Sequence, residues 1–364
     1  MADPSPSTPE FVFVTCQVGA ERALKSEVAR KWPELHFAYS RGGFVTFKLT
    51  DGLKLPADFD LDCTFARAHG FSLEKVSGTD LNARAERVAH VARDGRFDVL
   101  HVWQRDTARP GYRGFEPGMT PAAREADAAI RQALSQSDTI ESPLGGGVAE
   151  PGQLVLDCVL IEPDLWWTGY HRARRGESCL AGGLRPIAQP PGAVSRAWAK
   201  MEEAFQWSQF PIRPGQRLVE LGCAPGGASQ AALAHGLIVT GVDPAAVDPV
   251  VLAHPNFTHV QKRGADTRRR EFRGVKWLAA DMNVAPESTL ETVGNIVTHP
   301  SVEVEGLLLT LKLLDWEQAA QLPEFLERVR AWGYPQVRAR QLAHNRQEVC
   351  VAALRRSARE KTLR

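Results

Sequence analysis

The stretch that most constrains the fold of this chain is residues 218–227, which read Leu-Val-Glu-Leu-Gly-Cys-Ala-Pro-Gly-Gly. A short apolar run that leads directly into a glycine-rich turn is typical of a buried parallel strand. Because glycine has no Cβ, such a turn lets a ligand lie against bare backbone. A second apolar run, residues 237–242, ends at Asp243. The segment therefore predicts an open α/β sheet with a ligand site at the carboxyl ends of its strands.

The residues of this turn indicate the kind of ligand. A carboxylate at the tip of the second strand, Asp243, is placed to accept hydrogen bonds from both ribose hydroxyls of an adenosine group. The turn is not the G-x-G-x-x-G of dinucleotide-binding proteins, because Pro225 stands directly before Gly226 and Gly227. It resembles the E-x-G-x-x-P-G-G loop of S-adenosylmethionine-dependent methyltransferases. The alternative is a tight turn that needs glycine for its geometry alone.

Composition excludes several classes of protein. A chain of 364 residues is long for one domain, so two or three are expected. Its apolar runs, such as residues 154–161, have the length of strands and not of membrane spans, and the first residues show no secretory signal. The six cysteines are scattered without a C-x-x-C pair, which argues against a zinc site and for a reducing compartment. We expect a cytoplasmic protein with no membrane partner.

The order of predicted elements divides the chain into a lead and three units. Residues 1–10 are rich in proline and serine and are expected to be disordered. Residues 11–70 fit a small β-α-β unit, and a second unit of similar pattern begins at residue 71. Residues 182–192 contain three prolines and form the best candidate linker. Beyond it, strands and helices alternate and the chain closes with a hairpin, residues 336–342 and 347–354. That pattern predicts a doubly wound, mostly parallel sheet with a terminal antiparallel strand.

Basic residues are concentrated in three places although the net charge is only +1. They lie in residues 262–276, in residues 171–175 and at the C-terminus from Arg355 onward. Such patches suit contacts with phosphate groups. Solvated loops and a frayed tail are the alternative explanation for each patch taken alone.

Four charged residues could carry chemistry. Asp281 directly follows the predicted strand 275–280, and Lys312 ends the strand that begins at Gly306. An ammonium group among leucines needs a carboxylate partner, because burying an unpaired charge is unfavourable, and Asp281 is the obvious one. Glu348 shares a strand face with small, neutral residues, and Lys200 lies on the helix before the first strand of the sheet. Taken singly, each of these residues also fits an ordinary surface position.

Together, in the order Lys-Asp-Lys-Glu, these residues resemble the K-D-K-E tetrad of the FtsJ-like ribose 2′-O-methyltransferases. Within that group the chain is similar to the bacterial large-subunit (23S) rRNA cytidine 2′-O-methyltransferases that carry an N-terminal THUMP domain. The segments that carry the resemblance are Trp167-Thr-Gly-Tyr170, Ser195-Arg-Ala-Trp-Ala-Lys200-Met-Glu-Glu-Ala-Phe205, Glu220-Leu-Gly-Cys-Ala-Pro-Gly-Gly227, Val242-Asp243, Asp281-Met282, Leu311-Lys312-Leu313 and Ala339-Arg-Gln-Leu-Ala-His344-Asn-Arg-Gln-Glu348-Val349.

The resemblance implies a role for each group of residues. Lys200, Asp281, Lys312 and Glu348 would form the catalytic site, with Lys312 on the ribose 2′-oxygen as a general base or as a cation that stabilises the alkoxide. S-adenosylmethionine would contact Glu220, Gly222, Cys223, Ala224, Pro225, Gly226, Gly227, Asp243, Asp266 and Asp281. RNA would contact Arg172, Arg174, Arg175, Arg268, Arg269 and Arg270. No metal is implied, since the sulfonium is already an activated leaving group.

The resemblance also implies a domain organisation. It predicts a ferredoxin-like unit at residues 11–70, a THUMP-like RNA-binding domain at 71–185 and a Rossmann-like class I methyltransferase domain at 186–364. The chain departs from the family at Asp315 and Glu317, where basic residues are usual, and Asp266 aligns only with a small shift. The rival functions are an RNA-binding protein with a vestigial methyltransferase fold and a methyltransferase that acts on another RNA, a protein or a small molecule. A nicotinamide oxidoreductase is disfavoured by Pro225 and by the closing hairpin.

Overall fold

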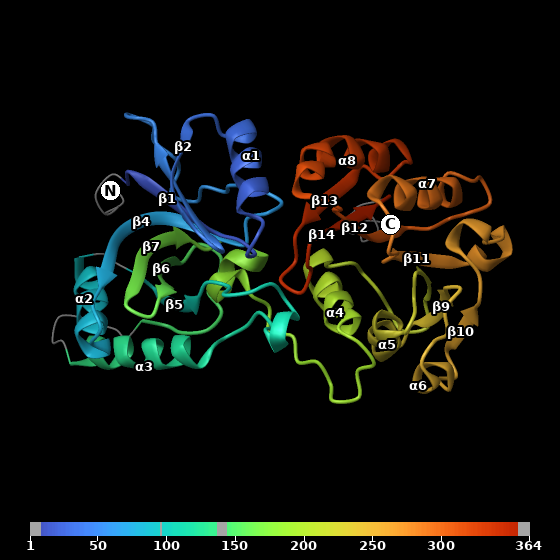
Figure 1. The fold of residues 1–364 in the computed structure, drawn as a ribbon, viewed down its shortest axis with the longest axis horizontal. Helices are drawn as coiled ribbons and strands as arrows, with labels where there is room; N and C mark the ends of the chain where they lie inside the picture. The colour runs from blue at the N-terminus through green and yellow to red at the C-terminus, as the bar shows by residue number, and fades with distance from the viewer. Residues whose placement is uncertain (1–8, 95–96, 137–143, 356–364) are drawn as a thin grey trace. The chain divides into compact units, whose positions relative to one another are not determined.

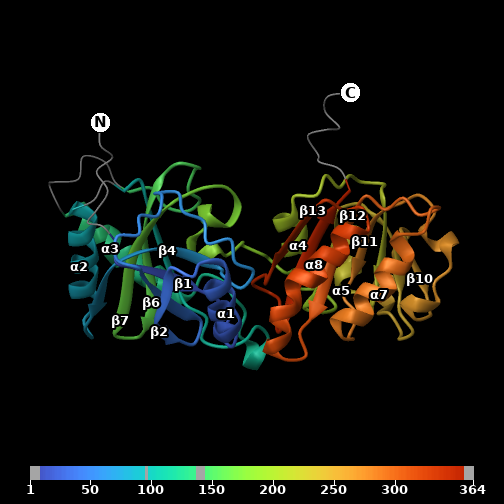
Figure 2. The same ribbon diagram turned by 90° about the horizontal axis from the view of Figure 1, so that it is seen from above.

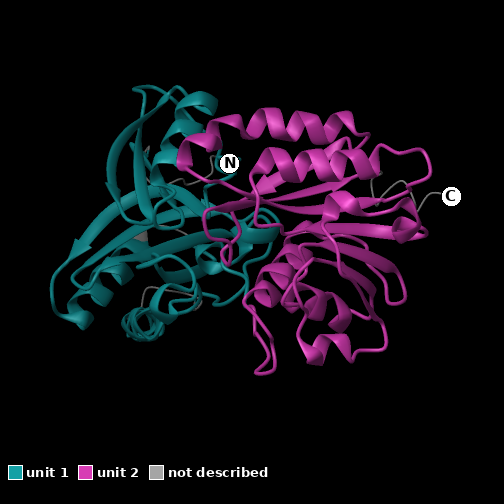
Figure 3. Cartoon of the chain, turned by 45° about the vertical axis from the view of Figure 1, so that its right-hand side comes forward, with its two compact units in different colours: residues 1–186 teal, residues 187–364 magenta. Residues whose placement is uncertain are grey.

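The chain forms two compact units. The computed structural model describes residues 9–94, 97–136 and 144–355. Unit 1 is Met1–Pro186 and unit 2 is Ile187–Arg364 (Figure 3). The division falls inside the proline-rich stretch 182–192. Most of the expected disordered lead, and the C-terminal basic cluster beyond Arg355, lie outside the described residues.

Unit 1 is built on one seven-stranded sheet with the order β2-β3-β1-β4-β7-β6-β5. Only the β5–β6 pair is parallel, and the other pairs are antiparallel. Helices α2 and α3 lie side by side in this unit (Figure 1). The strands are β1 (Phe11–Thr15), β2 (Leu35–Arg41), β3 (Phe44–Leu49), β4 (Ala68–Ser77), β5 (Val99–Gln104), β6 (Leu154–Glu162) and β7 (Leu165–Arg172). The helices are α1 (Glu21–Lys31), α2 (Leu81–Asp94) and α3 (Pro121–Ser135), with short 3-10 turns η1 (Tyr112–Gly114), η2 (Gly176–Cys179) and η3 (Ala181–Gly183).

The two modules predicted for the N-terminal part share this sheet. Strand β1 pairs with β4, with Val12 opposite Phe71, so the hydrogen-bonded ladder runs through the predicted boundary at residue 70. Aromatic side chains from both sides of that boundary form one apolar cluster, which includes Phe13, Phe44, Trp103 and Trp167. The assignment of the two segments as ferredoxin-like and THUMP-like stays a prediction.

Unit 2 is built on a second seven-stranded sheet, with the order β10-β9-β8-β11-β12-β14-β13. Strands β10, β9, β8, β11 and β12 pair in parallel, and β14 is antiparallel to both of its neighbours. In the two views of Figures 1 and 2, α4 and α5 cover one face of this sheet and α7 and α8 the other. The Rossmann-like arrangement with a terminal antiparallel hairpin is therefore confirmed.

The elements of unit 2 follow the predicted alternation, with additions. The strands are β8 (Arg217–Leu221), β9 (Ile238–Val242), β10 (Phe257–Val260), β11 (Val275–Ala280), β12 (Gly306–Lys312), β13 (Gln336–Arg340) and β14 (Glu348–Leu354). The helices are α4 (Ala197–Ser208), α5 (Gly227–Ala234), α6 (Pro249–Leu252), α7 (Pro286–Val297) and α8 (Leu322–Ala331), with 3-10 turns η4 (Gly264–Asp266), η5 (Arg269–Phe272) and η6 (Trp316–Gln321). Among the described residues, none of the helices is both long and apolar enough to cross a bilayer.

One predicted helix is divided in the structure. The periodicity of residues 316–332 predicts a single helix, but η6 ends at Gln321 and α8 begins at Leu322. Proline is compatible with the first turn of an α-helix and not with its interior, and Pro323 stands in the first turn of α8. The Asp315 side chain also starts η6 by accepting hydrogen bonds from the Glu317 and Gln318 N–H groups.

Candidate active site

The register of unit 2 brings the ends of its central strands to one edge of the sheet. Leu221 on β8 lies opposite Ala280 on β11, which lies opposite Leu309 on β12. The residue after β11, Asp281, remains tied to β8 because its N–H donates to the Leu221 carbonyl at 3.0 Å. Lys312, the last residue of β12, pairs directly with Glu348, the first residue of β14. Three of the four predicted catalytic side chains are therefore placed together by strand pairing alone.

The fourth, Lys200, reaches the same point from the first turn of α4 and closes a ring of alternating charges. Lys200 Nζ lies 2.6 Å from Asp281 Oδ2 and 2.7 Å from Glu348 Oε1. Lys312 Nζ lies 2.8 Å from Asp281 Oδ1 and 3.0 Å from Glu348 Oε2. Each ammonium group thus contacts both carboxylates, and each carboxylate contacts both ammonium groups.

This ring is largely shielded from water, so its charges interact strongly. The side chain of Glu348 is 6% exposed and that of Lys312 is 23% exposed. Burial raises the pKa of the Asp281 and Glu348 carboxyl groups, but the two lysines outweigh it and hold each pKa below its usual value. Burial lowers the pKa of Lys312, and the two carboxylates outweigh it, so that pKa is raised. Both carboxylates and Lys312 are therefore charged at neutral pH.

A further carboxylate, Glu203, helps to position two of the elements that carry the ring. No pattern in the sequence singles it out. It is buried on α4 and accepts hydrogen bonds from the N–H groups of Ala343 and His344, each at 2.8 Å. These residues belong to the loop between β13 and β14, whose Asn345 donates to Glu348 Oε1 at 3.3 Å. Glu203 follows Lys200 by three positions on α4, so both lie on the same face of that helix. It ties the helix that carries Lys200 to the loop that precedes Glu348.

The glycine-rich turn has the close-packed geometry that its sequence predicts. Gly222 has φ +83°, and a Cβ there would lie 2.6 Å from the Asp281 carbonyl oxygen. Glycine is thus required for the ends of β8 and β11 to approach each other. At Gly226, with φ +118°, a Cβ would lie 2.9 Å from the Val251 side chain. The turn therefore needs these two glycines for its own geometry, whatever ligand lies over it.

The residues around the turn also fit the adenosine group that the sequence predicts. The Asp243 carboxylate follows β9 and accepts hydrogen bonds from the N–H groups of Ala224, at 3.1 Å, and Ala245, at 2.8 Å. These two bonds fix its orientation beside the turn. An ionised carboxylate has room for about four hydrogen bonds, so Asp243 keeps acceptor capacity for two hydroxyl groups. Cys223 and Ala224 are small, which leaves the backbone of the turn accessible at Ala224 and Pro225.

Glu220 lies on β8, just before the turn. The pKa of its carboxyl group is raised, whereas those of Asp281 and Glu348 are lowered. Glu220 is 1% exposed, and the Ser229 hydroxyl donates to its Oε2 at 2.5 Å. Burial raises the pKa of this carboxyl group to about 8, although the hydrogen bond from Ser229 acts in the opposite direction. Glu220 is therefore mostly protonated at neutral pH, and its predicted contact with a cofactor would be that of a neutral acid.

The raised pKa of Glu220 predicts a pH-dependent stability. Between about pH 4.5 and pH 8 the unfolded chain loses the Glu220 proton and the folded chain keeps it, so this group's contribution to stability is complete below pH 4.5 and lost as the pH rises to 8. Glutamine does not titrate. The unfolding free energy of Glu220→Gln minus that of the wild type should rise by at most about 1.4 kcal/mol per pH unit across this window and level off above it. Urea unfolding at several pH values measures the difference; a difference that does not change with pH contradicts the protonated Glu220.

The structure places most of the other predicted residues at the surface, and Arg172 is half-buried. Asp266 is exposed in η4, and Arg268, Arg269 and Arg270 are exposed at η5. Arg172, Arg174 and Arg175 lie in unit 1, at the end of β7 and just after it. Arg174 is paired with Asp60 at 3.1 Å, an exposed ion pair of little strength. The roles of these residues stay predictions.

A comparison with known protein families assigns the part of the chain that holds three of the four ring residues. Residues 193–318 match the family model of FtsJ-like methyltransferases. This part of the chain is an FtsJ-like methyltransferase domain. It begins just before α4 and includes Lys200, Asp281 and Lys312, while Glu348 lies beyond the matched range.

Curated relatives extend the similarity to most of the chain. The ribosomal RNA large subunit methyltransferase M of Hahella chejuensis is 27% identical over 93% of this chain and 88% of its own length. The protein of the same name from Tolumonas auensis is 24% identical over 92% of this chain and 93% of its own length. That of Laribacter hongkongensis is 30% identical over 48% of this chain and 52% of its own. The two longer alignments include the N-terminal unit as well as the FtsJ-like domain.

Proposed function

We propose that this chain transfers the methyl group of S-adenosylmethionine to the ribose 2′-hydroxyl of a cytidine in large-subunit (23S) rRNA or its precursor. The observation that carries the proposal is the closed ring of Lys200, Asp281, Lys312 and Glu348 at the carboxyl edge of the sheet. Relatives named as large-subunit rRNA methyltransferases align with most of the chain and support the choice of RNA. A cytoplasmic location, where ribosomes are assembled in bacteria, belongs to the same proposal.

The ring suits a reaction in which a weak nucleophile must be positioned precisely. S-adenosylmethionine supplies a methyl group on a positively charged sulfur, which needs no further activation. The chain's task is to hold the 2′-oxygen in line with that methyl group, and good positioning can supply about 7–11 kcal/mol of the barrier in the best cases. Asp281 and Glu348 fix the Lys312 ammonium group, which donates a hydrogen bond to the 2′-oxygen. The ammonium group stabilises the negative charge that develops there as the hydroxyl proton leaves to water.

The charges of the ring favour this role for Lys312 over that of a general base. A lysine that accepts a proton near neutral pH needs a lowered pKa. The neighbouring carboxylates of Asp281 and Glu348 raise the pKa of Lys312, despite its burial. Lys312 is therefore a fixed cation before substrate binds, and we propose that it remains one during methyl transfer.

The exposed arginines at η5 are proposed to contact RNA phosphates. Changing Arg268, Arg269 and Arg270 together to alanine should reduce the slope of log affinity against log salt by up to about 2, since each phosphate contact to a single strand contributes about 0.7. Filter binding to rRNA fragments at several salt concentrations measures the slope. The control is Arg213→Ala/Arg217→Ala, which removes two exposed arginines before and at the start of β8. If the triple change leaves the slope unaltered, these three arginines do not contact RNA phosphates.

The proposed function is tested by mapping the ribose methyl groups of rRNA in a strain that lacks the gene. We expect one 2′-O-methylcytidine of the large-subunit rRNA to disappear and to return when the wild-type gene is restored. Restoration with Lys312→Ala should leave the site unmethylated. An unchanged methylation map contradicts the proposal, and together with intact RNA binding it would favour the RNA-binding protein with a vestigial methyltransferase fold.

A further inference from the structure

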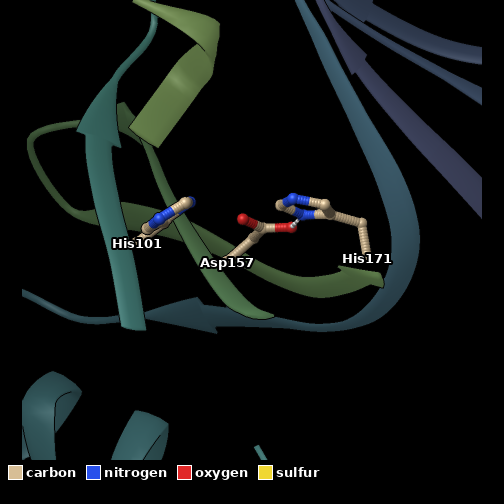
Figure 4. Close-up of side chains that lie close together, drawn as sticks. All are labelled: His101, Asp157 and His171. Atoms are coloured by element: carbon tan, nitrogen blue, oxygen red, sulfur yellow. Dashed lines mark hydrogen bonds and ion pairs between the residues drawn. The ribbon is translucent and has the colours of Figure 1, made fainter. Parts of the chain in front are cut away.

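Three potential metal ligands lie together in unit 1, before the FtsJ-like domain in the chain. They are His101 on β5, Asp157 on β6 and His171 on β7 (Figure 4). His101 is directly opposite Asp157 in the parallel β5–β6 pair. His171 is opposite Val155 in the β6–β7 pair, so it lies diagonally across from Asp157. One nitrogen from each histidine and one carboxylate oxygen lie within 4.8 Å of one another, with Asp157 between the two rings.

Backbone hydrogen bonds fix which nitrogen of each ring carries a hydrogen. His101 Nε2 lies 3.0 Å from the Gly147 carbonyl oxygen, and His171 Nε2 lies 2.7 Å from that of Ser178. A carbonyl oxygen can only accept, so each Nε2 is the donor. In a neutral imidazole the other nitrogen, Nδ1, then carries a lone pair. His101 is therefore held in the tautomer that presents Nδ1 as a ligand, whereas Nδ1 of His171 becomes a ligand when a metal ion displaces the proton between it and Asp157.

The hydrogen bonds within this cluster leave two of its buried polar atoms without a partner. His171 Nδ1 lies 2.6 Å from Asp157 Oδ2, and a proton on that nitrogen would account for this one contact. His101 Nδ1 and Asp157 Oδ1 are left without hydrogen-bond partners, although His101 is 1% exposed and Asp157 is 0% exposed. Buried polar atoms without partners are rare, because they have lost their hydration without compensation. Two electron-rich atoms are thus enclosed where a cation would bind both.

We propose that His101, Asp157 and His171 bind a divalent transition-metal ion, with Zn²⁺ as the best match. Two imidazole nitrogens and one carboxylate form a ligand set that suits zinc, with a water molecule as the fourth ligand. Metal-binding histidines commonly donate their second nitrogen to a backbone carbonyl, and both rings here do so. The ion would join β5, β6 and β7 to the segments that hold Gly147 and Ser178.

This site differs from what the sequence predicts. The expectation of no metal rests on the scattered cysteines and on a methyl transfer that needs no Lewis acid. Neither argument applies to His101, Asp157 and His171, because these residues are distant in the sequence and meet only through strand pairing. The proposed ion takes no part in methyl transfer.

Zinc binding by the full chain, prepared without a histidine tag and freed of metal with a chelator, tests the proposal. Titration with Zn²⁺ against a chromophoric chelator should show one bound ion per chain. Asp157→Asn and His101→Gln should each weaken binding by more than about 100-fold, since the loss of a partner outside the first shell already weakens it by about 10–100-fold. The control His36→Gln removes an exposed histidine of the same unit and should bind as the wild type does.

A second measurement uses the wild type, so it tests metal binding even if a variant does not fold. Zn²⁺ at about 100 times its dissociation constant should raise the Tm of the wild type by roughly 5–10 °C, because it binds only the folded chain. Co²⁺ bound to the wild type should show the visible absorption of a tetrahedral ion. The absence of zinc binding by the wild type would overturn the proposal. So would equal affinities for folded Asp157→Asn and the wild type.

Discussion

Replacing Lys312 by alanine is expected to abolish methyl transfer while the affinity for the cofactor stays near that of the wild type. Lys312 Nζ is the cation that we place on the ribose 2′-oxygen, and it is held there by Asp281 and Glu348. Removal of a single donor to developing negative charge commonly lowers kcat by about 10²–10³-fold, and here the charge of the donor is lost as well. The glycine-rich turn and Asp243, which we propose bind the cofactor, are not altered by this change.

Two measurements separate chemistry from binding in this variant. Initial rates at saturating RNA report the methyl-transfer step, and calorimetric titration with S-adenosylhomocysteine reports cofactor affinity. Lys276→Ala is the matched control, because Lys276 is also a strand lysine of this sheet, paired with Glu305 at 2.9 Å, but lies near the start of β11. We expect the control to keep its rate. A Lys312→Ala enzyme with more than a tenth of the wild-type rate would contradict the proposed role.

The second large effect is expected for Glu348→Gln, which leaves two lysines with one carboxylate. Glu348 is 6% exposed and contacts both Lys200 and Lys312. Removing one partner from a buried ion pair typically destabilises a protein by about 3–5 kcal/mol, because the other charge remains buried and uncompensated. Activity should also fall by at least about 100-fold, since Lys312 loses one of the two groups that fix its position.

A double-mutant cycle tests whether the lost stability comes from charge imbalance. Lys312→Met/Glu348→Gln removes one charge of each sign, so it should be more stable than Glu348→Gln alone although it is inactive. Urea unfolding should give a coupling energy of about 0.5–3 kcal/mol. The matched cycle on Lys276 and Glu305, a more exposed pair, should give less than about 1 kcal/mol. Equal coupling in the two cycles would show that the ring of charges is not specially coupled.

The sequence predicts most of unit 2 because its strands are apolar runs bounded by turn residues. Strands β8 and β9 read in this way, and so does the hairpin of β13 and β14. Strand β10 is only Phe257–Val260, with one buried residue, so no periodic signal marks it. In unit 1, β2 has no clear signal in the sequence for the same reason, since Leu35 is its one buried residue. A strand that pairs at the edge of a sheet and buries few side chains has little apolar periodicity in its sequence.

The active site was predictable in part from physical reasoning. Lys312 among leucines requires a carboxylate partner, and the structure places Asp281 at 2.8 Å from it. Lys200 and Glu348 look like ordinary surface residues in the sequence, and only the family resemblance joined them to the other two. Glu203 meets Ala343 and His344 across a separation of about 140 residues, which no local pattern reveals. Asp315, a departure from the family's basic residues, has a local structural role as the cap of η6.

The most direct test of the central claim is mass spectrometry of nucleosides from large-subunit rRNA that the purified chain has methylated with labelled S-adenosylmethionine. The account predicts label in 2′-O-methylcytidine with the wild type and no label with Lys312→Ala. Label on a base, or label at the ribose that persists with Lys312→Ala, would contradict a catalytic site built from Lys200, Asp281, Lys312 and Glu348.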